Sequence, residues 1–311
     1  MGMDTTAYDA VKAWSAFPVL IFPDPSNIFL DRSQRFAALA KGHSLGDWLS
    51  FLGRLTQVQH KLLQEYPFLS LPDEAALAFA QEHRQPPILA SSWLRDPSWQ
   101  RALTDLAHEL MPYAPPAAQD TLERLQAMNG KMIEALADRV LKLDLTGQNS
   151  DFLPFVAAAL QVHWTALTAR LDQTKVLPLD TPGVCPCCGF LPVAGLVRAD
   201  GEVAKLRYLH CALCNAEWHL ERVTCAVCRS SNRIAYQYIE GSEGTVRAET
   251  CDACGSYLKL IYREKSPQAD PVADDLSTLV LDMLVDEAGY NRVSPNLLFS
   301  SCRDTGFHGT D

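Results

Sequence analysis

The stretch CALCNAEWHLERVTCAVC, residues 211–228, holds two of the four Cys-x-x-Cys pairs that decide how this chain folds. The first pair is Cys185 and Cys188, and 22 residues separate it from this stretch. The last pair is Cys251 and Cys254, again separated by 22 residues. Because each cysteine of the first two pairs is matched 40 residues later, the segment is a tandem repeat of a 40-residue unit.

The repeat includes more than the cysteines. We call a Cys-x-x-Cys pair with the turn that follows it a knuckle. Each unit is predicted to contain, in order, a knuckle, a strand, a turn, a strand, a second knuckle and a third strand. We expect strands over 193–198, 202–209, 234–239 and 256–262, where strand-forming residues flank the turns. The features that recur at the 40-residue interval are the turn dipeptides Asp200-Gly201 and Glu240-Gly241, the arginines Arg207 and Arg247, and the leucines Leu220 and Leu260.

Two cysteines at positions i and i+3 can face one ion only if the chain turns back sharply after the second. Such a turn favours a residue that tolerates a positive φ. Gly189, Asn215 and Gly255 follow three of the pairs and meet this requirement, whereas Arg229, after Cys228, does not. Four thiolates from two such knuckles complete the closed tetrahedral set of structural zinc or mononuclear iron sites.

The pairing of the knuckles has two solutions. A cross-brace would join the first pair to the third and the second to the fourth. A sequential arrangement gives each 40-residue unit its own ion, and the self-similarity of the units favours it. The candidate ligands are then Cys185, Cys188, Cys211 and Cys214 for one ion and Cys225, Cys228, Cys251 and Cys254 for the other.

Disulfides and catalytic dithiols are the competing explanations for these cysteines. Nothing at the amino terminus resembles a signal peptide, so we expect a reducing cytoplasm, where structural disulfides are rare. Thioredoxin-like dithiols occur singly beside a βαβ unit and not four times at a fixed spacing. Two further cysteines lie outside the pattern: Cys187 is a spare thiol between two candidate ligands, and Cys302 is an expected free thiol near the carboxyl end.

Charge and hydropathy exclude two classes of partner. The formal charge is −10, but residues 181–265 hold ten Lys and Arg against nine Asp and Glu. Eight thiolates on two divalent ions would add −4, so the cysteine region lacks the basic face that nucleic-acid binding needs. No apolar run reaches the ~18 residues of a membrane span, so direct membrane insertion is not expected.

The amino-terminal half carries helical periodicity. Residues 1–30 contain three prolines and no helical period and are expected to form an extended arm. From Asp31, the proposed first cap, apolar residues recur at helical spacing to about residue 171, which predicts one all-α domain. Ser44 is the expected start of the second helix. The tryptophans on these stripes, Trp48, Trp99 and Trp164, are expected to fill the core and not to bind a cofactor.

One more helix is expected after Pro267. Asp270 caps it, and Gly289 ends it. We expect this helix to brace the cysteine modules against the helical domain. His210 and His219 flank the second knuckle and are expected to support the site or lie at the surface, because four cysteines per unit already complete each set. The apolar face of the helix would consist of Leu276, Leu279, Val280, Met283 and Leu284.

Four stretches carry a resemblance to a known family. They are FPDPSNIFLDRSQRFAALAKGHSLGDWLSFLGRLTQVQ (22–59), LRYLHCALCNAEWHLERVTCAVC (206–228), AETCDACGSYLKLIYREKSP (248–267) and VADDLSTLVLDMLVDEAGYNR (272–292). Together they resemble the FdhE proteins, accessory factors of respiratory formate dehydrogenases. The resemblance extends over nearly the whole chain.

The resemblance implies a cytoplasmic maturation factor that contacts the catalytic subunit of a formate dehydrogenase before its export by the Tat pathway. It also implies rubredoxin-like iron ligation by the eight paired cysteines, and the CPCCG run from Cys185 to Gly189 looks like a rubredoxin knuckle. We expect two metal ions, with iron favoured and zinc the alternative. The oligomeric state is left open, with a homodimer as one alternative.

No catalytic constellation, P-loop or dinucleotide fingerprint accompanies these motifs, so we expect a binding and assembly protein and not an enzyme. An iron redox protein and a structural zinc-ribbon adaptor are the alternatives. The predicted fold class is α+β and multidomain: an all-α domain, two tandem rubredoxin-like or zinc-ribbon modules and a carboxy-terminal helix. The expected boundaries are 1–30 for the arm, 31–177 for the helical domain, 183–223 and 224–266 for the modules, and 267–311 for the final helix and tail.

Overall fold

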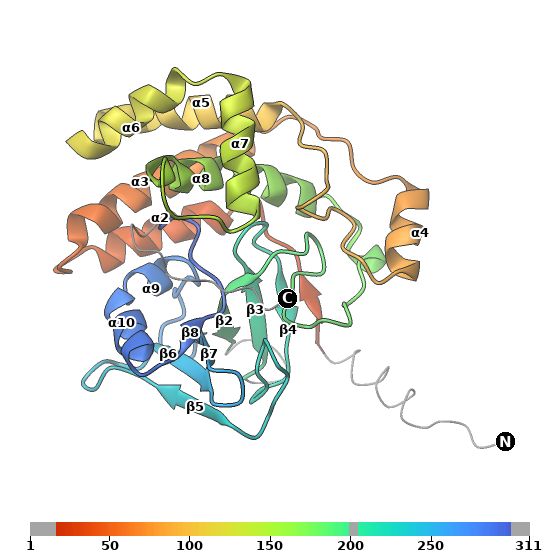
Figure 1. The fold of residues 1–311 in the computed structure, drawn as a ribbon, viewed down its shortest axis with the longest axis vertical. Coiled ribbons are helices and arrows are strands. Elements are labelled where there is room, and N and C mark those ends of the chain that lie inside the picture. Colours follow the sequence, from red (N-terminus) through yellow and green to blue (C-terminus); the bar gives the residue numbers. More distant parts are fainter. Residues whose placement is uncertain (1–16, 199–204, 300–311) are drawn as a thin grey trace.

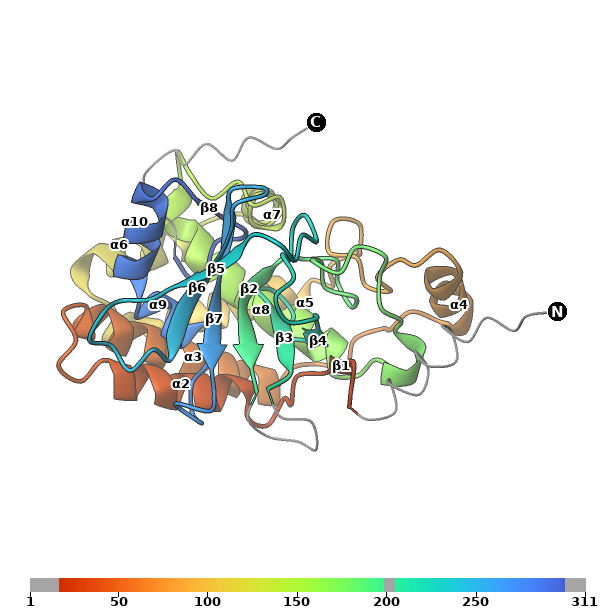
Figure 2. The same ribbon diagram turned by 90° about the horizontal axis from the view of Figure 1, so that it is seen from below.

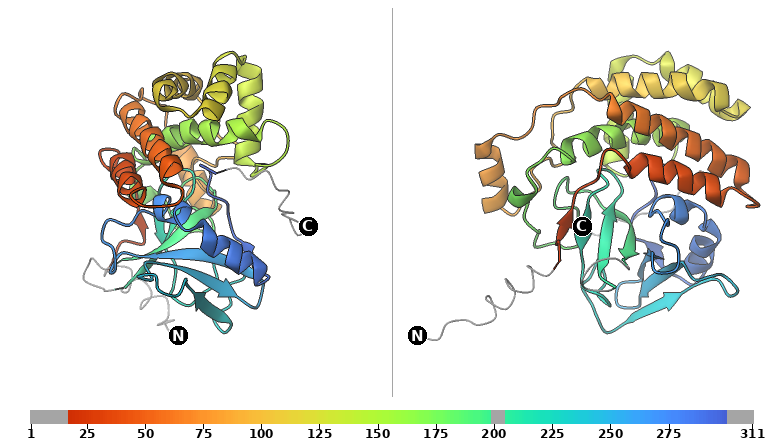
Figure 3. Two further views of the ribbon diagram at one scale, coloured as in Figure 1. Left: turned by 90° about the vertical axis from the view of Figure 1, so that its left-hand side faces the viewer. Right: turned by 180° about the vertical axis from the view of Figure 1, so that it is seen from behind.

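The computed structural model describes residues 17–198 and 205–299. Helices from the first half of the chain lie over one side of a mixed sheet that is built from the second half (Figure 1). Figure 3 shows this layering from the side: the helices coloured red to green lie above, and the strands coloured teal to blue lie below. The predicted fold class is confirmed.

Seven α-helices make up the amino-terminal part that the structure describes. Three single 3-10 turns, Met111–Tyr113, Ser150–Phe152 and Gln173–Lys175, extend or connect them. The helices are α2 (Ile28–Leu39), α3 (Gly46–Gln64), α4 (Glu74–Glu82), α5 (Ser98–Leu110), α6 (Pro116–Gln126), α7 (Gly130–Leu141) and α8 (Leu153–Thr168).

Two predicted helix starts are wrong. Helix α2 begins at Ile28, and Asp31, the predicted cap, lies in its first turn. The chain already turns before the helix, at Asp24-Pro25, because the amide of Ile28 donates to the Asp24 carbonyl at 3.0 Å. Ser44 does not cap α3, because the helix begins at Gly46 and its N-cap residue is Leu45, with no side-chain hydrogen bond to the first turn.

Helix α8 is the centre of the helical domain. Every residue from Phe155 to Thr168 is buried, which matches an apolar sequence without a polar face. Trp164 on α8 and Trp99 on α5 have no exposed surface, so both fill the core as expected. Trp48 is half-buried and packs edge-on against Phe299. The core therefore runs from this helix to the end of the described chain.

The eight strands of the described residues form one sheet with the order β1-β4-β3-β2-β7-β6-β5, and β8 also pairs with β7. Figure 2 shows the central strands side by side. The strands are β1 (Leu20–Ile21), β2 (Pro192–Val197), β3 (Arg207–Cys211), β4 (Glu217–His219), β5 (Ile234–Gln237), β6 (Val246–Cys251), β7 (Ser256–Tyr262) and β8 (Asn291–Arg292).

Each 40-residue unit supplies three antiparallel strands, and the two units join through parallel pairing of β2 with β7. Gly195 lies opposite Leu260 in this pairing. An added Cβ on Gly195 would lie 2.4 Å from a methyl carbon of Leu260, so the Leu260 side chain would have to move if Gly195 were replaced. The predicted turn at Asp200-Gly201 lies outside the described residues.

The amino-terminal segment extends the sheet at the edge of the first unit. Strand β1 pairs antiparallel with β4, and Leu20 lies opposite Trp218. The hydroxyl of Tyr208 also donates to the carbonyl of Pro18 at 2.7 Å. The strand in this segment is therefore limited to Leu20–Ile21, and the segment is held against the first module.

The segment after Pro267 forms two helices, α9 (Ala273–Leu276) and α10 (Leu279–Glu287), and not the single helix that the sequence predicted. Asp270 does cap the first, accepting from the amide of Ala273 at 2.8 Å. At the break, Lys259, a buried lysine on β7, donates from its ammonium to the carbonyls of Asp275 and Thr278. The same carbonyls also accept backbone amides of the turns between the two helices.

The predicted apolar face of this segment is also wrong in part. Leu276 is buried, but Val280, Met283 and Leu284 are exposed by 59%, 60% and 49%. Leu281 and Val285 form the buried face of α10. Because of the break after α9, α10 is rotated relative to its position in the single predicted helix. The apolar face predicted for one continuous helix therefore cannot face the core along both helices.

The expected bracing role is observed for α9. It packs against α2, and the guanidinium of Arg35 on α2 pairs with the carboxylate of Asp274. Within residues 17–198 and 205–299, no helix combines the length and apolarity that crossing a membrane requires.

Candidate metal centres

The sulfurs of Cys185, Cys188, Cys211 and Cys214 converge at one point, all within 4.8 Å of one another. The Sγ atoms of Cys185 and Cys214 are 3.5 Å apart, as are those of Cys188 and Cys211. Four sulfurs at about 2.3 Å from one ion form a tetrahedron with edges of about 3.8 Å. The group therefore has nearly the dimensions of a four-thiolate site.

The second group repeats this arrangement. Cys225, Cys228, Cys251 and Cys254 also lie within 4.8 Å of one another. The sulfurs of Cys225 and Cys254 are 3.7 Å apart, and those of Cys228 and Cys251 are 3.6 Å apart. The cysteines thus gather sequentially, one group per 40-residue unit, and the cross-braced alternative is wrong.

The disulfide alternative is also wrong for the cysteines that the structure describes, all of which are free. A disulfide requires sulfurs about 2.05 Å apart, well below the separations within either group. Cys187 is a buried free thiol, as expected from its position between two members of the first group. Cys302 lies outside the described residues.

A left-handed residue follows all four cysteine pairs, at the three positions where the sequence indicated it and also at Arg229, where it did not. The φ angles are 72° at Gly189, 61° at Asn215, 62° at Arg229 and 67° at Gly255. Arg229 therefore makes the same turn as the others despite its side chain, which is exposed. Its amide donates to the carbonyl of Cys225 at 3.1 Å, the bond that closes the turn.

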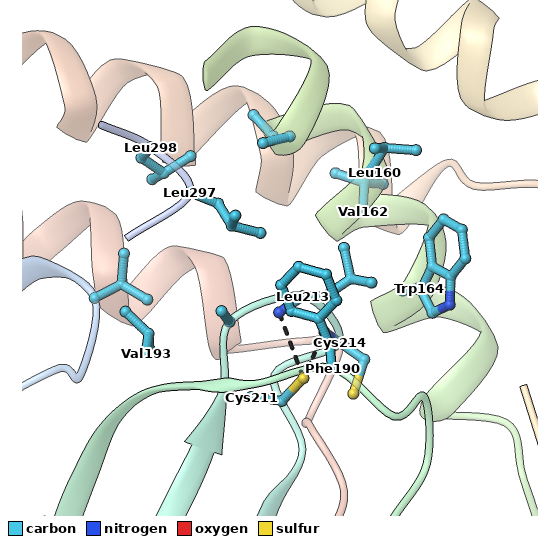
Figure 4. Packing of buried hydrophobic residues seen from close by; sticks show 14 of the residues in the cluster. Leu160, Val162, Trp164, Phe190, Val193, Cys211, Leu213, Cys214, Leu297 and Leu298 are labelled. Carbon is cyan, nitrogen blue, oxygen red and sulfur yellow. Dashed lines mark hydrogen bonds between the residues drawn. The ribbon is translucent and has the colours of Figure 1, made fainter. Parts of the chain in front are cut away.

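Backbone amides point at the sulfurs. The amides of Leu213 and Cys214 both donate to the Cys211 sulfur at 3.4 Å, and Figure 4 shows this knuckle beneath helix α8. The amide of Val227 donates in the same way to the sulfur of Cys225 at 3.4 Å. Such donors favour a negatively charged sulfur.

The thiols of the first group differ in how readily they ionise. Burial raises the pKa of Cys185, Cys188 and Cys211. Burial acts the same way on Cys214, but hydrogen bonds from the surrounding thiols lower its pKa well below the usual value. Burial therefore opposes the simultaneous ionisation of all four thiols. A bound cation would compensate the charge of all four, so the donor set fits a metal ion.

In the second group, burial also opposes ionisation of Cys225, but hydrogen bonds from the amides of Cys228 and Val227 lower its pKa to about 7. Burial raises the pKa of Cys251 to about 12. In each group, then, hydrogen bonds lower the pKa of one thiol, Cys214 in the first and Cys225 in the second. Each of them could hold a metal ion.

The first group is sealed by the helical domain. The segment before α5 covers one knuckle, since the amides of Ile88 and Ala90 donate to the carbonyls of Cys187 and Cys188 at 3.2 and 2.9 Å. Helix α8 covers the other, where the amide nitrogen of Gln161 donates to the Ala212 carbonyl at 2.8 Å. Trp164, Phe190 and Leu213 fill the space around it (Figure 4).

A buried polar network extends from the first group to both ends of the chain. The side chain of Asn215 donates to the Thr165 hydroxyl at 2.8 Å and accepts from the guanidinium of Arg32 at 2.9 Å. Arg32 also pairs with Asp270 at 3.0 Å. Sequence reasoning missed Arg32, because an arginine in an amphipathic helix gives no signal that it is buried.

The two histidines beside the second knuckle have different surroundings. His210 is fully buried, with its Nε2 3.1 Å from the Asn215 side chain and its Nδ1 3.4 Å from the carboxylate of Glu217. Burial would raise the pKa of Glu217, but His210 and Arg198 lower it to about 2. His219 packs against aromatic rings at the sheet edge. Neither belongs to a four-cysteine group, as expected.

Family models match nearly all of this chain. The model described as FdhE, N-terminal, matches residues 17–181, FdhE, central domain, matches 184–222, and FdhE, C-terminal domain, matches 223–299. The first covers the helical domain, and the second covers the first four-cysteine group. The third covers the second group with α9, α10 and β8.

Curated relatives and a solved structure agree with these models. Protein FdhE homolog of Pectobacterium atrosepticum is 36% identical over 281 residues, which cover 90% of this chain and 89% of that protein. Protein FdhE of Escherichia coli O157:H7 is 35% identical over 280 residues, 90% of each chain. The crystal structure of the FdhE protein from Pseudomonas aeruginosa matches with a TM-score of 0.79 and 36% identity, covering 90% of this chain and 98% of that one.

A helical domain that seals one of two tandem four-cysteine modules defines a class of metal-binding accessory proteins. Within that class, this chain belongs to the FdhE family. The family is associated with formate dehydrogenase maturation, and this member has two four-cysteine groups suited to zinc-ribbon-like metal binding.

Proposed function

We propose that this protein is a cytoplasmic accessory factor required for the maturation and activity of a respiratory, Tat-exported formate dehydrogenase, and that it binds the catalytic subunit of that enzyme. The observation that carries the proposal is FdhE family membership over about 90% of the chain, cysteine modules included. The domain boundaries proposed with it are 31–177, 183–223 and 224–266, followed by a carboxy-terminal segment from 267.

The eight paired cysteines are the metal ligands in this proposal. Each group would hold one ion, which supplies the charge that stabilises four thiolates and thereby fixes two knuckles to each other. Iron is favoured over zinc because of the Cys185-Pro186-Cys187-Cys188-Gly189 knuckle. The sulfur separations of 3.5–3.7 Å support a tetrahedral set for either metal.

The protein acts by binding and not by catalysis. A set of four cysteine ligands leaves no open position for substrate or water on the ion, which argues against metal-assisted hydrolysis. The Arg32 network and the sealed first group instead hold the helical domain, the sheet and α9 together as a rigid body. A rigid surface is what recognition of a partner requires, because little ordering entropy is lost on binding.

Two experiments test this function. Affinity-tagged protein is purified without oxygen from cells that produce formate dehydrogenase, and the proposal predicts that the catalytic subunit co-purifies. The chain is also expressed in Escherichia coli lacking its own FdhE, where it should restore formate oxidation. Absence of every formate dehydrogenase subunit from the purified material, together with no restored activity, would indicate an adaptor for another partner.

An iron redox role is the second candidate, and it is favoured by the exposure of the residues Cys228 and Cys254, which brings one group to the surface. Ultraviolet-visible and EPR spectra of anaerobically purified protein distinguish the two roles. Protein that contains only zinc, which is spectroscopically silent, and still supports maturation excludes electron transfer.

A further inference from the structure

The two four-cysteine groups are equivalent in sequence but not in exposure. All four cysteines of the first group are buried. In the second group Cys225 and Cys251 are buried, whereas Cys228 and Cys254 are exposed. These two are the second cysteines of their knuckles, and their counterparts 40 residues earlier, Cys188 and Cys214, have no exposed surface. The difference therefore arises from what covers each module.

The helical domain covers only the first module. Its knuckles are hydrogen-bonded to the segment before α5 and to α8, as described above. The corresponding knuckles of the second module contact the chain on one side, where the Asn291 amide donates to the Gly255 carbonyl at 2.7 Å. On the open side the chain neighbours of the exposed Cys228 and Cys254, namely Val227, Arg229 and Ala253, are themselves exposed.

The polar surroundings of the sulfurs also differ. The hydroxyl oxygen of Ser256 lies 3.0 Å from the sulfur of Cys254 and 3.7 Å from that of Cys225. At the corresponding position the first module has Ala216, which is buried and has no group to offer. A hydroxyl and water beside a sulfur both stabilise a thiolate that is released from an ion, so exchange of that ligand is easier.

We propose that the second centre is the chemically accessible one: thiophilic reagents and competing thiol ligands reach it through Cys228 and Cys254, whereas the first centre is closed. This rests on the proposal that both groups hold ions. Exchange with a thiol forms a bond from the incoming sulfur to the ion as the bond from Cys254 breaks. The proton of the incoming thiol passes to the released cysteine, and no electron is transferred.

Alkylation measures this accessibility directly. The full-length protein, with its metal content measured first, reacts with iodoacetamide for increasing times; each reacting sulfur forms a bond to carbon, and iodide leaves. We expect Cys228 and Cys254 to be modified at least about ten-fold faster than Cys188 and Cys214, as read by peptide mass spectrometry. The metal content should fall by one ion per chain and then stay constant.

Two controls accompany this experiment. In denaturant all eight paired cysteines should be alkylated at similar rates. Such a result would show that the difference in rate in the native protein is caused by the fold. A coloured chelator, 4-(2-pyridylazo)resorcinol, should independently remove one ion quickly and leave the other. Cys187 provides an internal reference, since it is buried without being a candidate ligand and should react as slowly as Cys188.

The possible failures are distinct. Protein that carries no bound ion as purified would refute the proposed metal sites, and this inference with them. Two ions lost at one common rate, or Cys188 and Cys214 modified as fast as Cys228 and Cys254, would refute the inference alone and leave the proposed function standing.

Discussion

Arg32, in the first described helix, forms a buried ion pair with Asp270, 238 residues further along the chain, with a nitrogen–oxygen distance of 3.0 Å. The same guanidinium donates to Asn215 in the second knuckle. Burial alone would raise the pKa of Asp270, but the charge of Arg32 lowers it. One side chain thus connects the helical domain, the first four-cysteine group and the carboxy-terminal segment.

Replacing Arg32 tests the importance of this connection. We predict that Arg32→Ala lowers the free energy of unfolding by about 3–5 kcal/mol, because it leaves the Asp270 carboxylate buried without its partner. Urea denaturation provides the measurement.

The matched control is Lys61→Ala, which removes an exposed ion pair with Glu109 at 2.9 Å. It should cost less than about 1 kcal/mol. Equal effects of the two substitutions would show that the Arg32 network does not hold the domains together.

The two modules should respond differently to the loss of one cysteine. Cys211→Ser and Cys251→Ser alter equivalent positions, and we predict that each reduces the metal content by about one ion per chain. Cys211→Ser should lower the melting temperature more, because the first group lies beneath α8 and the core packs directly on it. Metal analysis and thermal melting measure both effects. A variant that keeps two ions would show that the altered cysteine is not a ligand.

Arg229 carries a backbone conformation that glycine adopts at lower cost. Its φ of 62° is left-handed, and the corresponding positions in the other knuckles are Gly or Asn. We predict that Arg229→Gly is more stable than Arg229→Ala by about 1 kcal/mol, because alanine keeps the Cβ that disfavours this conformation. The comparison is made by chemical denaturation of metal-loaded protein. Equal stability would mean that the knuckle imposes no such conformation in solution.

Stability should depend on pH through His163, a buried histidine on α8 whose Nδ1 lies 3.0 Å from the Tyr66 hydroxyl. Burial lowers its pKa from 6.5 to about 4. Between these values the unfolded chain binds a proton that the folded chain does not. The stability that the folded protein gains from an uncharged His163 is therefore fully present above pH 6.5 and is lost as the pH falls towards 4.

Relative to His163→Gln, wild-type protein should lose about 2 kcal/mol of stability between pH 7 and pH 5. The comparison with the variant cancels acid effects on the cysteines, which both proteins share. A difference in stability that stays constant between these two pH values would contradict the prediction.

The local features of the site could be predicted from the sequence because they depend on short spacings. Two cysteines three residues apart, followed by a residue that accepts a positive φ, define a knuckle by themselves. The 40-residue period then indicated which knuckles gather. Even Arg229, which did not fit the rule, makes the turn that its position in the repeat requires.

Contacts between distant segments could not be predicted in the same way. Parallel pairing of β2 with β7 brings Gly195 opposite Leu260, and nothing in either strand indicates the other. At the division of the final helix, Lys259 binds carbonyls 16 and 19 residues away, and the helical pattern of the segment gives no sign of this. The unequal exposure of the two groups likewise depends on where the helical domain lies.

The most direct test of this account is the metal content of freshly purified protein, combined with X-ray absorption spectroscopy of the bound metal. The account predicts two ions per chain, each with four sulfur neighbours at about 2.3 Å. Nitrogen or oxygen neighbours in place of sulfur, or protein without metal whose eight paired cysteines are oxidised to disulfides, would contradict it.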